Sequence, residues 1–370
     1  MANSVRHLYV HVPFCARRCS YCDFSIAVRS SVPVASYVEA IALEIVRHDT
    51  QRWDLDTIYL GGGTPSRLGA GVADVVKIVR DRASVAGDVE ITIEANPDDV
   101  TPEDAAAWAE AGVNRVSLGA QSFDPAVLEW MHRTHSVPQV PAAVETLRAA
   151  GITNISLDLI FALPDSLSRD WSADLDRTLE LEPEHVSLYG LTIEPHTPLG
   201  RWRARGQVVE APEERYETEF MMAHERLGAA GFEHYEVSNF GRPGRRSSHN
   251  SSYWTGEPYA ALGPSAHSFD GNVRSWNVSA YADWERRVRS AESVVAESES
   301  LSEENRLSER VYLGLRTTDG LRATDAEIAV ARPWVDAGWA EILNRTIVLT
   351  ATGFLRLDAL AASLTLAGSR

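Results

Sequence analysis

Three cysteines, the only ones in the 370-residue chain, lie within one short segment at positions 15, 19 and 22. They follow an alternating run of apolar residues over 7–12 that predicts a β-strand, which Pro13 ends. The thiols therefore lie on a loop at the carboxyl end of that strand. Three thiols this close together indicate a metal site rather than three separately packed side chains, and no disulfide framework is available.

The number of thiols discriminates between metals. A structural zinc site needs four ligands, and no second Cys or Cys/His pair follows in the sequence. A four-iron cluster held by three thiolates keeps one iron open for a ligand from outside the protein. An unrelated zinc knuckle and packing cysteines are the alternatives. The Cys-x3-Cys-x2-Cys spacing resembles that of radical S-adenosylmethionine (SAM) enzymes, which implies a 4Fe-4S cluster whose open iron binds SAM.

A glycine-rich turn, residues 61–65, follows the second predicted strand. Gly61, Gly62 and Gly63 would let the backbone approach a ligand closely and present N–H and C=O groups to it. The turn is not a P-loop, because no Gly-Lys-Ser/Thr follows. A purely structural turn is the alternative. The glycine-rich turn lies one βα unit after the cysteine loop. In that position it resembles the motif with which radical SAM enzymes hold the methionine amine of SAM.

Strand-like and helix-like segments alternate from residue 5 to about residue 195. The predicted strands cover residues 6–12, 55–60, 89–95, 115–119, 155–160 and 185–191, and helical stretches such as 34–48 and 70–82 lie between them. Six βα repeats imply an α/β fold with a parallel sheet. They are too few for an eight-stranded barrel, so we expect a partial (βα)6 barrel with its active site at the carboxyl ends of the strands.

The pattern changes after about residue 200, where a long helix is predicted over 212–229 and a mixed segment follows. Residues 290–300 are biased in composition and predict a solvated linker. The last part predicts a helix from Ser302, a second helix capped by Thr324 and Glu327, a hairpin over 346–357 that turns at Thr352 and Gly353, and a final helix. This order is similar to a winged helix. We therefore predict domains at 1–230, 231–300 and 301–370.

Composition limits the classes of partner. The 35 basic and 52 acidic residues give a net charge of −17, which disfavours nucleic acid as a partner and suits the C-terminal unit to protein contact or domain docking. No apolar run is long enough to cross a bilayer, and residues 1–4 carry neither a signal peptide nor a lipidation signal. We expect a cytoplasmic protein.

Polar residues stand at the ends of successive predicted strands, where binding residues of a parallel barrel lie. Hydrogen bonding to loop backbone is their alternative role. Over about residues 5–315, the chain resembles the coproporphyrinogen dehydrogenase-like branch of radical SAM proteins. The segments that carry the resemblance are 8–15, 61–65, 93–97, 115–123 and 187–195. The resemblance implies that SAM is contacted by Tyr9, Gly62, Gly63, Thr64, Glu94, Gln121, Arg133 and Asp158.

Within that set, the resemblance implies ribose or amine hydrogen bonds for Glu94 and Asp158, and a carboxylate contact for Arg133. His132 and His135, on either side of Arg133, suggest a metal pair at first sight, but we expect them to be surface residues.

Two departures separate the chain from the decarboxylating members of this branch. Phe24 stands where those enzymes carry a fourth cysteine, and only about ten residues precede the core of the first strand. Both departures favour a resemblance to the HemW family of heme chaperones. Residues 249–254 match the His-Asn-x-x-Tyr-Trp motif associated with heme binding in that family: His249 could ligate iron, Tyr253 could ligate or hydrogen-bond, and Trp254 offers a flat apolar surface. A cluster that packs a domain junction is the alternative.

Two further features bear on heme. Arg245 and Arg246 lie in a glycine- and arginine-rich loop, which could clamp the two heme propionates or be a solvated basic loop. His267 is a secondary candidate for an iron ligand.

The resemblance implies a carrier that passes heme to apo-hemoproteins such as respiratory enzymes. We expect no coproporphyrinogen dehydrogenase activity and assign no catalytic residue. A coproporphyrinogen III dehydrogenase is one alternative, and a radical SAM methyltransferase or heme-degrading enzyme is another. A homodimer and association with a membrane surface are further expectations for its partners.

Overall fold

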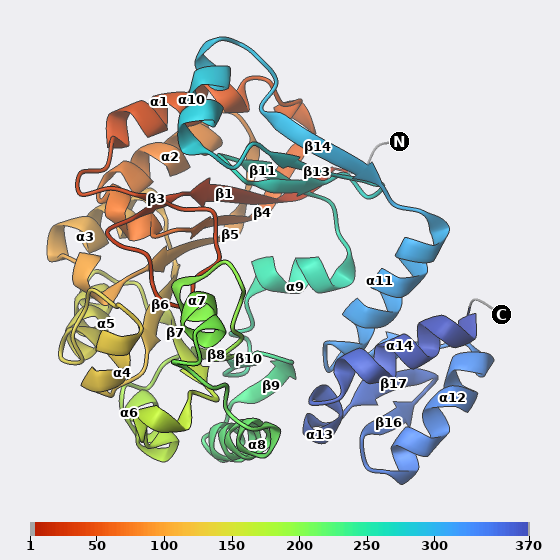
Figure 1. The fold of residues 1–370 in the computed structure, drawn as a ribbon. Coiled ribbons are helices and arrows are strands. Elements are labelled where there is room, and N and C mark those ends of the chain that lie inside the picture. Colours follow the sequence, from red (N-terminus) through yellow and green to blue (C-terminus); the bar gives the residue numbers. More distant parts are fainter. Residues whose placement is uncertain (1–3, 369–370) are drawn as a thin grey trace.

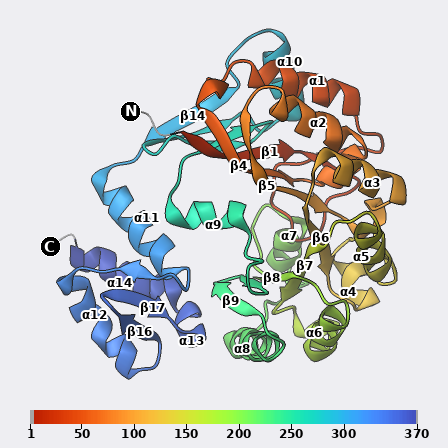
Figure 2. The same ribbon diagram turned by 180° about the vertical axis from the view of Figure 1, so that it is seen from behind.

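The computed structural model describes residues 4–368, and a twelve-stranded sheet is its largest element (Figures 1 and 2). Six neighbouring strands of this sheet run parallel and follow the chain in order: β1 (Val5–Val12), β4 (Trp53–Gly62), β5 (Ser84–Ala95), β6 (Arg115–Gln121), β7 (Asn154–Phe161) and β8 (His185–Gly190). These are the six predicted strands. The predicted α/β fold with a partial parallel barrel is therefore confirmed.

Helices cover the outer face of these strands, as both ribbon views show. They are α1 (Val34–Ile45), α2 (Gly71–Arg80), α3 (Pro102–Ala111), α4 (Pro125–Trp130), α5 (Gln139–Ala149), α6 (Trp171–Glu180) and α8 (Glu213–Ala229). Local signals start several of them. Thr101 accepts a hydrogen bond from the Asp104 backbone N–H at 3.1 Å, and Asp124 accepts one from Ala126 at 2.8 Å.

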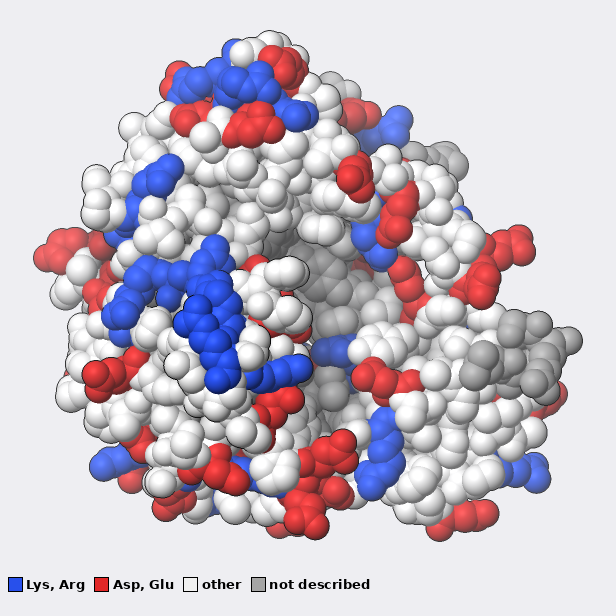
Figure 3. All heavy atoms as spheres, in the orientation of Figure 1, with Lys and Arg blue, Asp and Glu red and all other residues white. Residues whose placement is uncertain are grey.

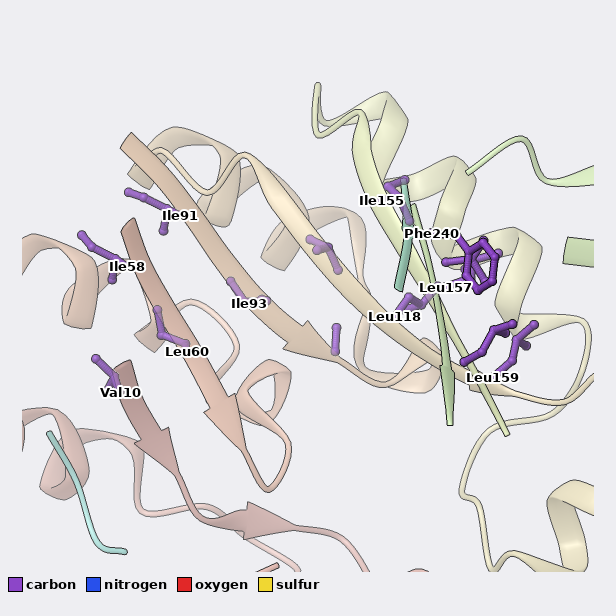
Figure 4. Close-up of a cluster of buried hydrophobic side chains, with 14 of the residues drawn as sticks. Val10, Ile58, Leu60, Ile91, Ile93, Leu118, Ile155, Leu157, Leu159 and Phe240 are labelled. Atoms are coloured by element: carbon purple, nitrogen blue, oxygen red, sulfur yellow. The ribbon is translucent and has the colours of Figure 1, made fainter. Parts of the chain in front are cut away.

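The main core lies between the sheet and these outer helices. Figure 4 shows part of it, including Val10, Ile58, Leu60, Ile93 and Leu118, all fully buried. Each such side chain contributes roughly 1.5–3 kcal/mol by leaving water. Strand residues alternate between faces, so the polar members of β1, His7, Tyr9 and His11, point to the inner face. Because the apolar side of these strands packs against the outer helices, their polar side faces the barrel interior.

Short strands extend the sheet at both edges. On one side β11 (Tyr259–Leu262) pairs parallel with β1, followed by the antiparallel strands β12 (His267–Phe269), β13 (Val273–Asn277) and β14 (Val295–Ser300). On the other side β10 (Asn239–Gly241) and β9 (Glu233–Glu236) follow β8. Strands from residues 231–300 thus belong to the same sheet as the barrel, while the three domain boundaries stay a prediction.

The expectation of a linker over 290–300 was wrong for its second half. Residues 295–300 form β14, which pairs antiparallel with β13. All six residues are exposed, because the strand lies at the edge of the sheet with no layer over it. The polar composition of a solvated edge strand resembles that of a linker, which explains the error.

Three smaller helices and one small sheet complete this part of the chain. The helix α7 (Pro198–Ala204) lies near the cysteine loop, α9 (Ser248–Thr255) lies on the inner side of the sheet, and α10 (Tyr281–Arg289) lies beside α1. The strands β2 (Phe14–Cys15) and β3 (Ala27–Val28) pair parallel around the cysteine loop.

The C-terminal unit has a three-stranded sheet with helices around it. Its elements are α11 (Glu303–Leu315), β15 (Leu321–Arg322), α12 (Asp325–Asp336), β16 (Ala340–Leu343), β17 (Thr346–Leu349), α13 (Ala351–Phe354) and α14 (Leu357–Gly368). The predicted capping box of Thr324 and Glu327 is present at the start of α12. No described helix is long and apolar enough to cross a membrane. Residues 1–3, part of the segment in which we expected no targeting signal, lie outside the described residues.

The predicted position of the C-terminal hairpin was wrong. The chain turns at Asn344 and Arg345, both with positive φ, between β16 and β17. Thr352 and Gly353 lie instead in α13, where the Thr350 side chain accepts a hydrogen bond from the Gly353 backbone at 3.2 Å. A Thr-x-x-Gly segment is compatible with a turn and with a capped helix, and here the cap forms.

Candidate functional site

A cavity of about 320 Å³ opens at the carboxyl ends of the parallel strands. Its wall brings together all three cysteines and seven of the eight predicted SAM contacts: Gly62, Gly63, Thr64, Glu94, Gln121, Arg133 and Asp158. These residues come from several strands of the sheet and from the loops that follow them, so only the parallel barrel places them side by side.

The cysteine loop is held in its middle, at Ser20, by two backbone hydrogen bonds. The Ser20 N–H donates to the Met131 carbonyl at 3.0 Å, and the Ser20 carbonyl accepts from Leu199 of α7 at 2.8 Å. Thr64 Oγ1 donates to the sulfur of Cys15 at 3.4 Å. Burial raises the pKa of the Cys15 thiol and raises that of Cys22 to about 11. Thiolates in this loop therefore need a positive partner such as iron.

The thiols fit a cluster better than a single ion. Within residues 4–368, no group of three or more His, Cys, Asp or Glu side chains gathers closely enough to hold one metal ion. Instead the three cysteines line a cavity larger than a tetrahedral zinc site requires. The donor set of three thiols and no fourth protein ligand suits an iron–sulfur cluster with one open iron.

The glycine turn is tight enough to require glycine. Gly62 has φ of 113°, and a Cβ there would lie 2.4 Å from the His11 ring. A Cβ on Gly63 would lie 2.7 Å from the Pro13 carbonyl. The backbone of the turn can therefore approach the cavity only without side chains.

Two carboxylates with unusual titration face the cavity. Glu94 accepts hydrogen bonds from the Gly62 N–H and the Tyr59 hydroxyl, both at 2.9 Å, and burial raises its pKa to about 7. Asp158 accepts from Ser117 at 2.9 Å, and burial raises its pKa to about 6. A ligand cation in the cavity would favour the ionised form of both groups.

Arg133 reaches across the same cavity. Its Nη2 donates to Asn96 at 2.6 Å and to the Gly119 carbonyl at 2.9 Å, and its Nη1 lies 3.5 Å from the sulfur of Cys19. Its buried Nε has no partner among the described residues. The guanidinium therefore has N–H donors without a partner among the described residues, which suits an anionic ligand group.

Two predicted residues beside this cavity need comment. Tyr9 does not line the cavity; its hydroxyl lies 3.1 Å from His11 Nδ1, and its ring stacks on Tyr59 behind the glycine turn. The expectation that both histidines near Arg133 are surface residues was wrong for His135. That residue is buried against the Ala120 carbonyl at 3.2 Å, whereas His132 lines the cavity. The short loop after α4 folds back onto the barrel, which buries one histidine.

Arginines gather beside the mouth of the cavity. Figure 3 shows a cluster of basic side chains over α7, the helix that carries Arg201 and Arg203. The cysteine loop, which carries Arg17 and Arg18, is hydrogen-bonded to the first turn of this helix. In a chain of net charge −17, this face is locally positive.

The predicted heme motif lies on α9, inside the barrel, and His249 is buried there. Its Nδ1 is 2.7 Å from Thr57 Oγ1, its Nε2 is 2.9 Å from the Tyr253 hydroxyl, and its ring stacks on Tyr59. Burial lowers its pKa to about 3, so the imidazole is neutral. Trp254 lies under the guanidinium of Arg316, at 4.4 Å from the ring centre.

Sequence reasoning missed the hydrogen-bond chain that fixes this imidazole. Thr57 also lies 2.9 Å from His7 Nδ1, and the Nε2 of His7 lies 2.9 Å from Glu257. The sequence did carry a signal for it: the polar residues of the alternating run 7–12 lie on one face of the strand, which is the inner face of β1. The inner face of the barrel is therefore a connected polar layer around α9.

The two candidate propionate-binding arginines differ in their surroundings. Arg246 forms ion pairs with Glu233 and Asp319, both at 3.3 Å, whereas Arg245 is exposed and has no ion pair among the described residues. His267, the secondary ligand candidate, is exposed on β12.

Comparison with known proteins adds to this geometry. The Radical SAM superfamily matches residues 9–176. The chain is 37% identical over 271 residues to the heme chaperone HemW of Lactococcus lactis, covering 73% of this chain and 71% of that relative. It is 37% identical to HemW of Escherichia coli, covering 70% and 69%, and 38% identical to that of Synechocystis, covering 70% and 65%.

Among solved structures, the fold matches the coproporphyrinogen III oxidase HemN of Escherichia coli, described as a radical SAM enzyme. The TM-score is 0.82 at 20% identity, and the match covers 98% of this chain and 91% of HemN. At that identity the similarity concerns the fold alone.

Proposed function

Because the chain belongs to the HemW family of radical SAM proteins, we propose that it is a heme chaperone that carries a 4Fe-4S cluster and SAM. In this proposal it binds heme and delivers it to apo-hemoproteins such as respiratory enzymes. The observation that carries the proposal is the heme chaperone identity of several relatives at 36–39% identity, joined to the His-Asn-x-x-Tyr-Trp segment on α9.

Cys15, Cys19 and Cys22 would hold the cluster, which when bound would supply one open iron for SAM and an electron source beside it. Around it the chain offers complementary charges. Glu94 and Asp158 would bind cationic or hydroxyl groups of SAM, and the free Nε of Arg133 would bind its carboxylate. The glycine turn, supported from behind by His11 and Tyr9, would present backbone groups to the methionine amine.

For heme, the proposal assigns His249 as an iron ligand, Tyr253 and Trp254 as ring contacts, and Arg245 and Arg246 as propionate contacts. The imidazole of His249 is neutral, as an iron ligand must be. Its Nε2 faces Tyr253, which is half-buried, so release of that hydroxyl is the smallest change that would free the nitrogen. The exchange replaces one hydrogen bond, of about 1 kcal/mol, by a metal bond.

Phe24 separates this proposal from a coproporphyrinogen III dehydrogenase. Its side chain is 57% exposed and lines the mouth of the cavity. A phenyl ring there supplies an apolar surface and no thiol. The dehydrogenase is the second candidate, because the chain matches the Radical SAM superfamily and carries the cysteine set of a radical SAM enzyme.

The test combines three measurements on anaerobically reconstituted protein. Iron analysis should give about four irons per chain, and Cys19→Ala should lose most of them. Heme titration should give a saturable spectral change that His249→Ala alters. His48→Ala should not alter it, because His48 follows α1 and its ring packs against Trp53.

Incubation with coproporphyrinogen III, SAM and a reductant should yield no protoporphyrinogen. Release of carbon dioxide with turnover would contradict the chaperone proposal and support a coproporphyrinogen III dehydrogenase. If His249→Ala protein matched the wild type in heme spectrum, affinity and transfer rate, the motif would serve packing alone.

A further inference from the structure

The helix α9, on the inner side of the sheet in Figure 1, is held there at its N-terminus. Ser247 is the N-cap residue, and its side chain accepts a hydrogen bond from the Asn250 backbone N–H at 3.3 Å. The Ser247 N–H itself donates to the hydroxyl oxygen of Tyr235 on β9 at 3.2 Å. Because Ser247 and Tyr235 are both buried, loss of this bond would leave a backbone donor without a partner.

From Tyr235 a chain of buried side chains crosses the inner face of the sheet to the cavity. The Tyr235 hydroxyl lies 2.8 Å from His185 Nε2, and His185 Nδ1 lies 2.8 Å from Ser156 Oγ. Ser156 Oγ donates to Asp158, which lines the cavity, at 3.3 Å. We call Ser156, His185 and Tyr235 the inner-face chain. It connects the N-cap of α9 to a carboxylate of the cavity.

The protons along the inner-face chain all point the same way. A backbone N–H can only donate, so Tyr235 accepts from Ser247 and directs its own proton to His185. Burial lowers the pKa of His185 well below its ordinary value, so the ring is neutral and donates from Nδ1 to Ser156. Ser156 donates in turn to Asp158, which is a pure acceptor when it is ionised. Hydrogen bonds aligned in one direction strengthen one another, so the charge on Asp158 affects the bond that holds α9.

The environment of Asp158 leaves its charge open to influence by a ligand. Burial raises its pKa to about 6, against the hydrogen bonds of three serines and the positive charge of Arg115. The other titratable groups that face it are Glu94, Tyr59 and Tyr189. A cationic ligand group in the cavity favours the ionised carboxylate. An occupied cavity therefore favours the state in which the inner-face chain is strongest.

A second contact joins the same cavity to the same helix. Tyr59 on β4 donates from its hydroxyl to Glu94, which lines the cavity, at 2.9 Å. The ring of Tyr59 stacks on His249 of α9, with ring centres 4.9 Å apart and planes 26° apart. Two carboxylates of the cavity thus reach α9 by separate routes.

We propose that SAM bound at Asp158 and Glu94 holds α9 more tightly to the sheet, through the inner-face chain and Tyr59. This inference rests on the proposed binding of SAM and goes beyond it, because it makes SAM a regulator of the helix that carries the predicted heme motif. Such coupling needs no change of average structure, since a ligand can act by reducing local opening. It is also reciprocal, so a ligand that loosens α9 weakens SAM binding by the same factor.

The experiment is hydrogen–deuterium exchange of cluster-loaded protein with and without saturating SAM, in the absence of a reductant. SAM should slow exchange of residues 248–255 at least tenfold, because a tighter helix opens less often. Ser156→Ala and Tyr235→Phe, which break the inner-face chain at two links, should each leave at most threefold slowing. The double variant should behave like either single variant, because both act on one route. Tyr281→Phe, at a buried tyrosine of α10 outside the chain, is the matched control and should keep the full slowing.

Calorimetry with SAM on the same samples separates the inference from the proposed function. Wild-type protein that binds SAM with unchanged exchange over 248–255 would overturn the inference and leave the chaperone proposal intact. Equal slowing in wild type, Ser156→Ala and Tyr235→Phe would overturn it as well. If Tyr235→Phe loosens the whole sheet, Ser156→Ala decides, because it removes a single hydroxyl. A cluster-loaded wild-type chain that bound no SAM would overturn the SAM site of the proposed function itself.

Discussion

At the residue scale, the candidate site depends on a few positions where only one residue type fits. Gly62 combines a positive φ with a neighbour inside contact distance, and Glu94 is hydrogen-bonded to its N–H. The turn, the carboxylate and the cysteine loop are therefore linked through one backbone segment. A change at this segment should affect ligand binding more than global stability.

Gly62→Ala tests that link. The added Cβ would meet the His11 ring and hold an L-residue at φ of 113°, which costs on the order of 1–3 kcal/mol of folding stability. We expect SAM affinity, measured by calorimetry on cluster-loaded protein, to fall more than tenfold. Gly87→Ala on β5 is the control, because nothing lies within 4 Å of its Cβ. Unchanged SAM affinity in Gly62→Ala would show that the ligand does not use this turn.

The sequence predicts those site residues whose type suits ligand binding and whose position is at the end of a predicted strand. Cysteines, glycines and strand-end carboxylates all met at one cavity because parallel strands end on one side. The burial of His249 and His135 could not be predicted, because it depends on how the chain folds back: Thr57 lies 192 residues from His249, and Ala120 lies 15 residues from His135 on the preceding strand. Residue chemistry indicates which groups act, and tertiary contacts decide which are accessible.

At the element scale, strands with a buried face were predicted well and solvated elements were not. The turn of the β16–β17 hairpin was predicted at the wrong residues, and the edge strand β14 was predicted as a linker. In both places the sequence carries turn or linker residues without an apolar pattern. The helix α1 joins the added strands β12 and β13 to the barrel through the buried Glu44. Its carboxylate accepts from the Gly263 N–H at 2.8 Å and from Asn277 at 2.9 Å, one residue on each side of the β12–β13 hairpin.

Glu44 predicts a pH dependence of stability. Burial raises its pKa from 4.5 to about 7, so the folded state binds the proton more tightly than the unfolded state. The contribution of this group to stability is therefore fully present below pH 4.5 and is lost as pH rises through about 7, by on the order of 3 kcal/mol. Glu44→Gln should flatten this part of the profile, measured by urea unfolding between pH 5 and 8. Glu39→Gln, exposed on the same helix, should leave the slope unchanged. An identical slope in Glu44→Gln would assign the dependence to other groups.

At the scale of the whole molecule, the described strands form an open sheet and not a closed barrel. The cavity at the strand ends is framed by loops with a positive rim, and α9 lies on the inner side of the sheet. A closed barrel would have filled its interior with apolar side chains. Here α9 and its polar partners occupy that interior instead.

An open sheet also has two free edges, and β14 is one of them. All six of its residues are exposed, and Glu297 and Glu299 alternate along it. A free strand edge is a template on which another chain can add, and repelling charges prevent this. Glu297→Val with Glu299→Val should therefore make the protein aggregate over time, detected by light scattering, whereas Glu297→Lys should not. The acidic side chains of β14 would then prevent the free edge of the open sheet from pairing with other copies of the chain.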